Sequence, residues 1–212
     1  MKIAPDYSLY LVIGEEFTGG RPLLEVIRAA VEGGVTMVQL REKTATVQRT
    51  LELARDARTI LEPKSIPLII NDRLDIAIES GAAGVHLGQG DLACSEARRF
   101  AKPGFLIGVS VSTVEEATRA AQDGADYLGV SPVFDTATKL DTPVATGLEG
   151  LQRIRAAVSL PLVAIGGIKE SNAADIIRAG ADGVAVVSAI GLATDPAHAA
   201  RKLREAIKLG QR

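Results

Sequence analysis

The chain has 212 residues with a formal net charge of −2, and 47% of them are hydrophobic, mostly Ala, Val, Ile and Leu, which suits one α/β domain with a large core. Aromatic residues make up only 3% and no dense run of Lys or Arg occurs, so neither nucleic acid nor a membrane is expected as a partner. The single cysteine, Cys94, excludes an internal disulfide and is interpreted as a packing residue. The sequence shows neither a signal-peptide core nor an apolar run of ~18 residues, so we expect a cytoplasmic protein.

Two kinds of apolar run alternate along the chain and predict β-strands. Runs of the first kind often follow a proline, whereas runs of the second kind follow a glycine that ends a helix, where a left-handed backbone favours glycine. Because each run is apolar throughout, both faces of the strands should be buried, as in a parallel sheet. In chain order the predicted strands are 9–13, 34–40, 67–70, 81–87, 105–109, 124–130, 161–165 and 180–187.

Amphipathic stretches between these runs predict helices, and Thr113 with Glu116 fits a capping box, T-x-x-E, at the start of one of them. The predicted helices are 22–31, 47–61, 73–80, 92–101, 114–121, 148–157, 172–178 and 197–209. Strand and helix alternation in this length favours a closed parallel (β/α)₈ TIM barrel, with an open doubly wound sheet as the structural alternative. No linker divides the chain, so we expect residues 1–212 to form a single catalytic domain.

Polar residues and glycines follow seven of the eight predicted strands, at the end of the barrel where active sites of this fold lie. In chain order they are Gln39 with Arg41, Glu42 and Lys43; Asn71, Asp72 and Arg73; His86, Gln89 and Asp91; Ser110; Thr136, Thr138 and Lys139; Gly166 and Gly167; and Ser188. This convergence on one rim predicts a functional site better than any one of the residues does.

The rim residues suit the binding of phosphorylated small molecules. Arg41, Lys43 and Lys139 bring positive charge to it, and the backbone at Gly166 and Gly167 can approach a phosphate closely. A carboxylate pair, Asp72 and Asp91, follows adjacent strands and can bind Mg²⁺ together with phosphate oxygens of a substrate. The combination predicts a diphosphate substrate that binds together with a metal ion.

Taken singly, several of these residues have simpler interpretations. Asp72 and Asp91 each precede a predicted helix and can serve as N-caps. Arg41 and Glu42 can form a surface salt bridge, which contributes little. His86 lies in an apolar strand, where a histidine is more often part of the core than a ligand or a base. These alternatives stay open at this point.

Seven ordered motifs between about residue 8 and residue 190 resemble the thiamine-phosphate synthase family. They are Q-L-R-E-K at 39–43, N-D-R at 71–73, H-L-G-Q-x-D at 86–91, G-V-S at 108–110, T-x-T-K at 136–139, A-I-G-G-I at 164–168 and V-V-S at 186–188. The family joins a hydroxymethylpyrimidine diphosphate to a thiazole phosphate, which releases diphosphate and forms thiamine phosphate. Two departures concern the loop after the sixth strand. Ser131 stands where glycine is usual, and the loop reads D-T-A-T-K-L-D-T-P-V-A-T-G at 135–147, whereas the family more often has proline between or before its threonines.

The resemblance implies a role for each matching residue. It implies that the pyrimidine diphosphate is bound by Gln39, Arg41, Glu42, Lys43, Asn71, Ser110 and Lys139. It implies that the thiazole phosphate is bound by Thr136, Thr138, Gly167, Val187 and Ser188. Mg²⁺ is implied at Asp72 and Asp91, and catalysis at Arg41, Lys43, Ser110 and Lys139.

Three other functions are weighed against this one. A thiazole tautomerase, which resembles this sequence broadly, uses a histidine just after the fifth strand, where this chain has Ser110 to Thr113. A non-catalytic phosphate-binding barrel is disfavoured by the intact Asp72, Asp91 and Lys139. An epimerase or aldolase-like lyase would need a clear acid/base or Schiff-base pair, and none is evident.

Overall fold

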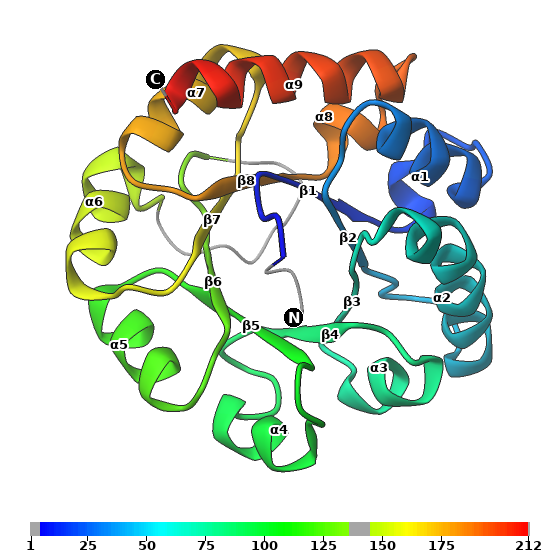
Figure 1. The fold of residues 1–212 in the computed structure, drawn as a ribbon, viewed down its shortest axis with the longest axis horizontal. Coiled ribbons are helices and arrows are strands. Elements are labelled where there is room, and N and C mark those ends of the chain that lie inside the picture. Colours follow the sequence, from blue (N-terminus) through cyan, green and yellow to red (C-terminus); the bar gives the residue numbers. More distant parts are fainter. Residues whose placement is uncertain (1–4, 136–144, 212) are drawn as a thin grey trace.

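The computed structural model describes residues 5–135 and 145–211, in which parallel strands close into a barrel in the order β1-β2-β3-β4-β5-β6-β7-β8. The first strand pairs with the second and with the eighth, which excludes the open-sheet alternative. Figure 1 shows the helices as an outer ring around the strands. The expectation of a (β/α)₈ barrel is therefore confirmed.

The strands are short and almost wholly buried. Their bounds are β1 (Leu9–Ile13), β2 (Met37–Leu40), β3 (Leu68–Asn71), β4 (Gly84–Leu87), β5 (Leu106–Val111), β6 (Tyr127–Val130), β7 (Leu162–Ile165) and β8 (Gly183–Val186). Each strand predicted to start at a glycine begins three residues later in the structure. The reason is that those glycines, Gly34, Gly81, Gly124 and Gly180, have positive φ and still belong to the turn that ends the preceding helix.

The helices follow the predicted ranges, with small shifts at their ends. Their bounds are α1 (Leu23–Glu32), α2 (Val47–Leu61), α3 (Leu74–Ser80), α4 (Cys94–Phe100), α5 (Val114–Gln122), α6 (Gly147–Ala157), α7 (Glu170–Arg178), α8 (Ser188–Gly191) and α9 (Pro196–Gly210). Short 3₁₀ turns lie at Glu15–Phe17 and Glu62–Lys64. The sequence did not predict α8, a single turn that follows β8 directly.

Two apolar clusters hold the barrel together. The larger one lies between the strands and the surrounding helices, where the outward side chains of each strand meet the inner faces of the helices. The smaller one fills the barrel interior with Tyr10, Met37, Ile69, Tyr127 and Val163, among others. Both faces of the strands are therefore buried, which explains their uninterrupted apolar sequences. Within residues 5–135 and 145–211, no helix combines the length and apolar content needed to cross a membrane.

The start of α5 fixes the chain just beyond the end of β5. Thr113 Oγ1 accepts a hydrogen bond from the backbone N–H of Glu116 at 3.2 Å, as predicted for an N-cap. The carboxylate of Glu116 accepts from the backbone N–H of Ser112 at 2.6 Å instead of completing a capping box with Thr113. The cap thus holds the backbone two residues after Ser110.

Candidate active site

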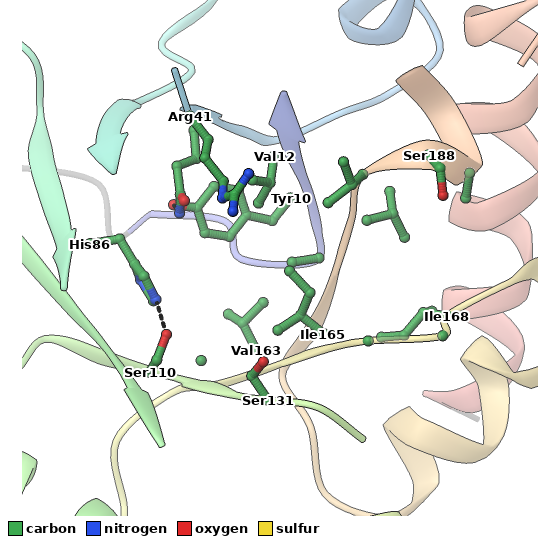
Figure 2. Close-up of a pocket in the computed structure, with 18 of the residues that line it drawn as sticks. Tyr10, Val12, Arg41, His86, Ser110, Ser131, Val163, Ile165, Ile168 and Ser188 are labelled. Atoms are coloured by element: carbon green, nitrogen blue, oxygen red, sulfur yellow. Dashed lines mark hydrogen bonds between the residues drawn. The ribbon is translucent and has the colours of Figure 1, made fainter. Parts of the chain in front are cut away.

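A cavity of about 460 Å³ opens at the C-terminal ends of the strands. Figure 2 shows side chains from several strands pointing into it, with Arg41 on one side and Ser188 on the other. Seven residues predicted for the site line this cavity: Gln39, Arg41, Asn71, Ser110, Gly167, Val187 and Ser188. They come from five parts of the chain that the barrel brings to one mouth.

Other predicted residues lie elsewhere. Glu42, Lys43, Asp72 and Asp91 do not line the cavity, although they follow strands that do contribute to it. Thr136, Thr138 and Lys139 lie outside the described residues, so their predicted roles stay predictions.

Buried polar groups form the floor of the cavity. Gln39 Nε2 donates to the hydroxyl of Tyr10 at 2.9 Å, and that hydroxyl lies 2.9 Å from the hydroxyl of Tyr127. The Tyr127 hydroxyl lies 3.1 Å from Nδ1 of His86, whose Nε2 lies 2.9 Å from Oγ of Ser110. His86 is therefore more than a core histidine, because it lines the cavity and contacts a predicted catalytic residue.

Arg41 is held at the rim by an acidic residue from the loop after β1. Its Nη1 lies 3.1 Å from Oε1 of Glu16, so the alternative of a pair between Arg41 and Glu42 is wrong. Glu42 Oε1 instead accepts the backbone N–H of Glu15 at 2.7 Å, and burial raises the pKa of Glu42. Glu42 braces the loop that carries Glu16, while the guanidinium of Arg41 faces the cavity.

Beside the cavity, Lys43, Asp72 and Asp91 form a compact charged cluster. Lys43 Nζ lies 2.5 Å from Oδ2 of Asp72. Burial alone would raise the pKa of Asp72, but hydrogen bonds from Lys43 and Asp91 hold that pKa below its ordinary value. Burial and contact with Asp72 raise the pKa of Asp91. The two carboxyl groups therefore lie against each other.

Neither carboxylate caps a helix, so that alternative is wrong. The residues at the N-cap positions of α3 and α4 are Arg73 and Ala93, and neither has a side-chain cap. Asp91 Oδ2 accepts the backbone N–H of Gly88 at 2.7 Å and closes the turn after β4. Asp72 has a φ of 62°, a left-handed conformation that is uncommon for residues other than glycine. Such strain is often found at functional sites.

On the opposite side of the cavity, two consecutive glycines follow β7. Gly166 and Gly167 have φ values of 105° and 64°, a backbone that favours glycine. A Cβ on Gly167 would lie 2.7 Å from the backbone oxygen of Asp135, so the position also lacks room for a side chain. Val187 and Ser188 line the same cavity from the neighbouring strand, where β8 passes into α8.

The sequence model of the thiamine monophosphate synthase family matches residues 9–190. This chain belongs to that family. A thiamine-phosphate synthase from Albidiferax ferrireducens is 52% identical over 94% of this chain and 91% of its own length. Another from Moorella thermoacetica is 49% identical over 96% of this chain and 97% of its own length.

A solved structure agrees with the family assignment, and a second shares the fold. A thiamine phosphate pyrophosphorylase from Pyrococcus furiosus is 36% identical, with a TM-score of 0.88 and 96% of each chain covered. A 3-hexulose-6-phosphate synthase, at 19% identity and a TM-score of 0.72 over 94% of this chain and 99% of its own, shares the fold alone.

In this member of the thiamine monophosphate synthase family, three residues around the cavity were not predicted from the sequence. Tyr10 and Tyr127 lie on its floor, and Glu16 positions Arg41. One signal for the tyrosines was available, since two of the three tyrosines in the chain fall within apolar strands. Cys94 is a packing residue as expected, because it is buried and burial raises its thiol pKa to about 11.

Proposed function

We propose that this chain joins a hydroxymethylpyrimidine diphosphate to a thiazole phosphate and releases diphosphate and thiamine phosphate. One observation carries the proposal: in a chain of this family, Arg41, Ser110 and Gly167 converge from three strand ends on one cavity. The partners are then two small phosphorylated molecules. The cytoplasmic location and the absence of nucleic-acid and membrane partners stay predictions.

The pyrimidine diphosphate binds along the ends of β2 to β5. Gln39, Asn71 and Ser110 present polar groups to the heterocycle, and Arg41 presents its guanidinium to the diphosphate. Breaking the C–O bond places negative charge on the leaving diphosphate, so fixed positive groups lower the barrier by stabilising that charge. Lys43 and Lys139 are proposed to share this task, and Glu42 to hold the nearby backbone.

The carboxylates of Asp72 and Asp91 fit a magnesium ion. Their carboxyl groups contact each other, so the negative charge that they share would favour a bound cation. Mg²⁺ usually takes only one or two carboxylates, with waters and substrate phosphate oxygens completing its shell. The described residues contain no group of three or more candidate ligand side chains. Such a group is not required for Mg²⁺, because two carboxylates are enough. When bound, Mg²⁺ supplies further charge stabilisation to the leaving diphosphate.

The thiazole phosphate binds on the opposite side of the cavity. Backbone N–H groups near Gly167 and Val187 and the hydroxyl of Ser188 suit a phosphate, which TIM barrels often bind after strands seven and eight. Thr136 and Thr138 are proposed to complete this subsite. Departure of diphosphate leaves a pyrimidine cation that the thiazole nitrogen attacks, so no protein nucleophile is needed, and positioning of the two substrates supplies much of the rate.

The direct test is to mix the purified protein with both substrates and Mg²⁺ and to follow the products by ³¹P NMR. We expect thiamine phosphate and diphosphate to appear in equal amounts. Binding of both substrates without product would favour a non-catalytic barrel. A thiazole phosphate isomer incubated alone tests the tautomerase alternative, and its conversion without any condensation would overturn the proposal.

A further inference from the structure

The hydrogen bonds on the cavity floor have a direction. An amide nitrogen donates and does not accept, so the hydroxyl of Tyr10 receives its bond from Gln39. Burial raises the pKa of Tyr10 and that of Tyr127 far above the ordinary value, so each phenol keeps one hydrogen. In the described part of the chain, Gln39 and Tyr127 are the partners of the Tyr10 hydroxyl. Its hydrogen therefore points to Tyr127, because a buried hydroxyl hydrogen without an acceptor is costly.

The direction then passes to the imidazole. Tyr127 accepts from Tyr10, so its own hydrogen goes to Nδ1 of His86. A ring nitrogen that accepts carries no hydrogen, and a neutral His86 must then carry its hydrogen on Nε2. Nε2 donates to Oγ of Ser110 at 2.9 Å, which leaves the Ser110 hydroxyl hydrogen to the cavity. Ser110 thus offers a donor, and the ligand atom that meets it is an acceptor such as a ring nitrogen or a phosphate oxygen.

Two glycines of the barrel leave space for the hydrogen-bonded side chains of Tyr127 and His86. A Cβ on Gly108 would lie 2.1 Å from Cζ of Tyr127 and 2.5 Å from Nδ1 of His86. A Cβ on Gly129 would lie 2.9 Å from Cε1 of His86. Neither glycine has positive φ, so the space they leave, and not backbone conformation, accounts for them. Any larger residue at Gly108 would separate Tyr127 from His86.

Ser110 is also fixed through its backbone. Gln89 Nε2 donates to the carbonyl oxygen of Ser110 at 2.7 Å, and the cap of α5 holds the chain that follows. Because the main chain is held, only the side chain of Ser110 can still change its orientation. The hydrogen bond from His86 Nε2 fixes that orientation.

We propose that Tyr10 and Tyr127 are positioning residues: with Gln39 they hold His86 as its Nε2–H tautomer, so that Ser110 presents its hydroxyl hydrogen to the ligand. The opposite orientation of the Gln39 amide would reverse every bond, put the hydrogen on Nδ1 and make His86 accept from Ser110. The two arrangements differ in chemistry, because only the reversed one lets His86 act as a base toward Ser110. The catalytic consequence rests on the proposed function, whereas the hydrogen positions do not.

The hydrogen positions can be read by ¹⁵N NMR of the imidazole. The chain has two histidines, so His198→Gln on the exposed side of α9 leaves His86 as the one imidazole signal. We expect a protonated Nε2 and an unprotonated, hydrogen-bonded Nδ1. In Tyr127→Phe the ¹⁵N chemical shift of Nδ1 should move to the value of an unprotonated nitrogen that accepts no hydrogen bond. A hydrogen on Nδ1 in the unsubstituted site, or on both nitrogens, would overturn the proposal even if the protein makes thiamine phosphate.

Kinetics test the positioning role. Tyr127→Phe and Tyr10→Phe keep the rings and should lower kcat roughly tenfold through the loss of one oriented hydrogen bond, with little change in KM for the thiazole phosphate. Tyr7→Phe is the matched control, because the Tyr7 ring packs 5.1 Å from that of Tyr127 while its hydroxyl is outside the chain of bonds. An unchanged kcat in both test variants would refute the role. Should Tyr127→Phe not fold, Tyr10→Phe and the NMR of the otherwise unchanged chain still decide it.

Discussion

Nζ of Lys43 lies 2.5 Å from Oδ2 of Asp72, so a lysine predicted to bind diphosphate is paired with a carboxylate predicted to bind magnesium. The same carboxylate contacts Asp91. If these carboxylates hold a cation, as proposed, it would compete with Lys43 for Asp72 and would free the ammonium to bind diphosphate. We therefore propose that metal binding and diphosphate binding are coupled through Lys43.

This coupling predicts opposite effects of Lys43→Ala on metal binding and on rate. Removal of the competing ammonium should tighten binding of Mn²⁺, a spectroscopic substitute for Mg²⁺, roughly fivefold, as expected for a partly exposed ion pair worth about 1 kcal/mol. The condensation rate should fall. Electron paramagnetic resonance titration measures the affinity, with Lys102→Ala as a distant control. Weaker Mn²⁺ binding in Lys43→Ala would contradict the competition.

Asp91→Asn removes the negative charge of this side chain while leaving an oxygen that can keep the turn after β4 closed. The amide oxygen can still accept the backbone N–H of Gly88, which Asp91 Oδ2 accepts at 2.7 Å, so the turn should survive. Loss of the carboxylate should remove most activity, and added Mg²⁺ should restore only part of it. Assays across a range of Mg²⁺ concentrations measure this effect. Asp175→Asn, which removes an exposed carboxylate on α7, is the control, and normal turnover by Asp91→Asn would discard the metal role.

Gly167→Ala tests the backbone subsite after β7. Alanine at a φ of 64° costs roughly 1–2 kcal/mol, and its Cβ would also meet the oxygen of Asp135 at 2.7 Å. We expect lower stability and a raised KM for the thiazole phosphate. Gly20→Ala has a φ of 80° with nothing near its Cβ, so it isolates the cost of conformation. Equal KM values in the two variants would show that the turn at Gly167 does not contact the phosphate.

Cys94 should be inert in the folded protein. Burial raises its thiol pKa to about 11, so near pH 8 the reactive thiolate is scarce. Alkylation by iodoacetamide should be slow at that pH, should accelerate as the pH approaches 11, and should become fast at pH 8 once denaturant unfolds the chain. Fast labelling of the native protein at pH 8, measured by mass spectrometry, would contradict the burial of this side chain.

Much of the barrel follows from local rules. A strand buried on both faces needs an apolar run, and a helix that ends in a left-handed turn favours glycine, so both appear in the sequence. The strand starts were misplaced at Gly34 and Gly180 because a glycine marks the end of a helix and not the start of the strand that follows. Active sites of this fold lie at the C-terminal ends of the strands, so cavity residues such as Arg41 and Ser110 could be predicted from their positions after the strands.

The rest depended on three-dimensional contacts that no local pattern encodes. In a strand that is apolar throughout, the alternation that separates inward from outward positions is not visible, so Tyr10 and Tyr127 could not be assigned to the cavity floor. The partner of Arg41 proved to be Glu16, from a different loop, and not its sequence neighbour. Such pairings are set by how the loops pack around the mouth.

We propose that diphosphate binds in the cavity beside β2 to β4, next to a metal held by Asp72 and Asp91, and that a phosphate binds beside Gly167 and Ser188. A crystal structure of the protein with thiamine phosphate, diphosphate and Mg²⁺ tests it most directly. We predict diphosphate oxygens on Arg41 and on a metal held by Asp72 and Asp91, with the thiamine phosphate group at the glycine turn after β7. Diphosphate bound away from Arg41, or a metal bound away from both aspartates, would contradict the account.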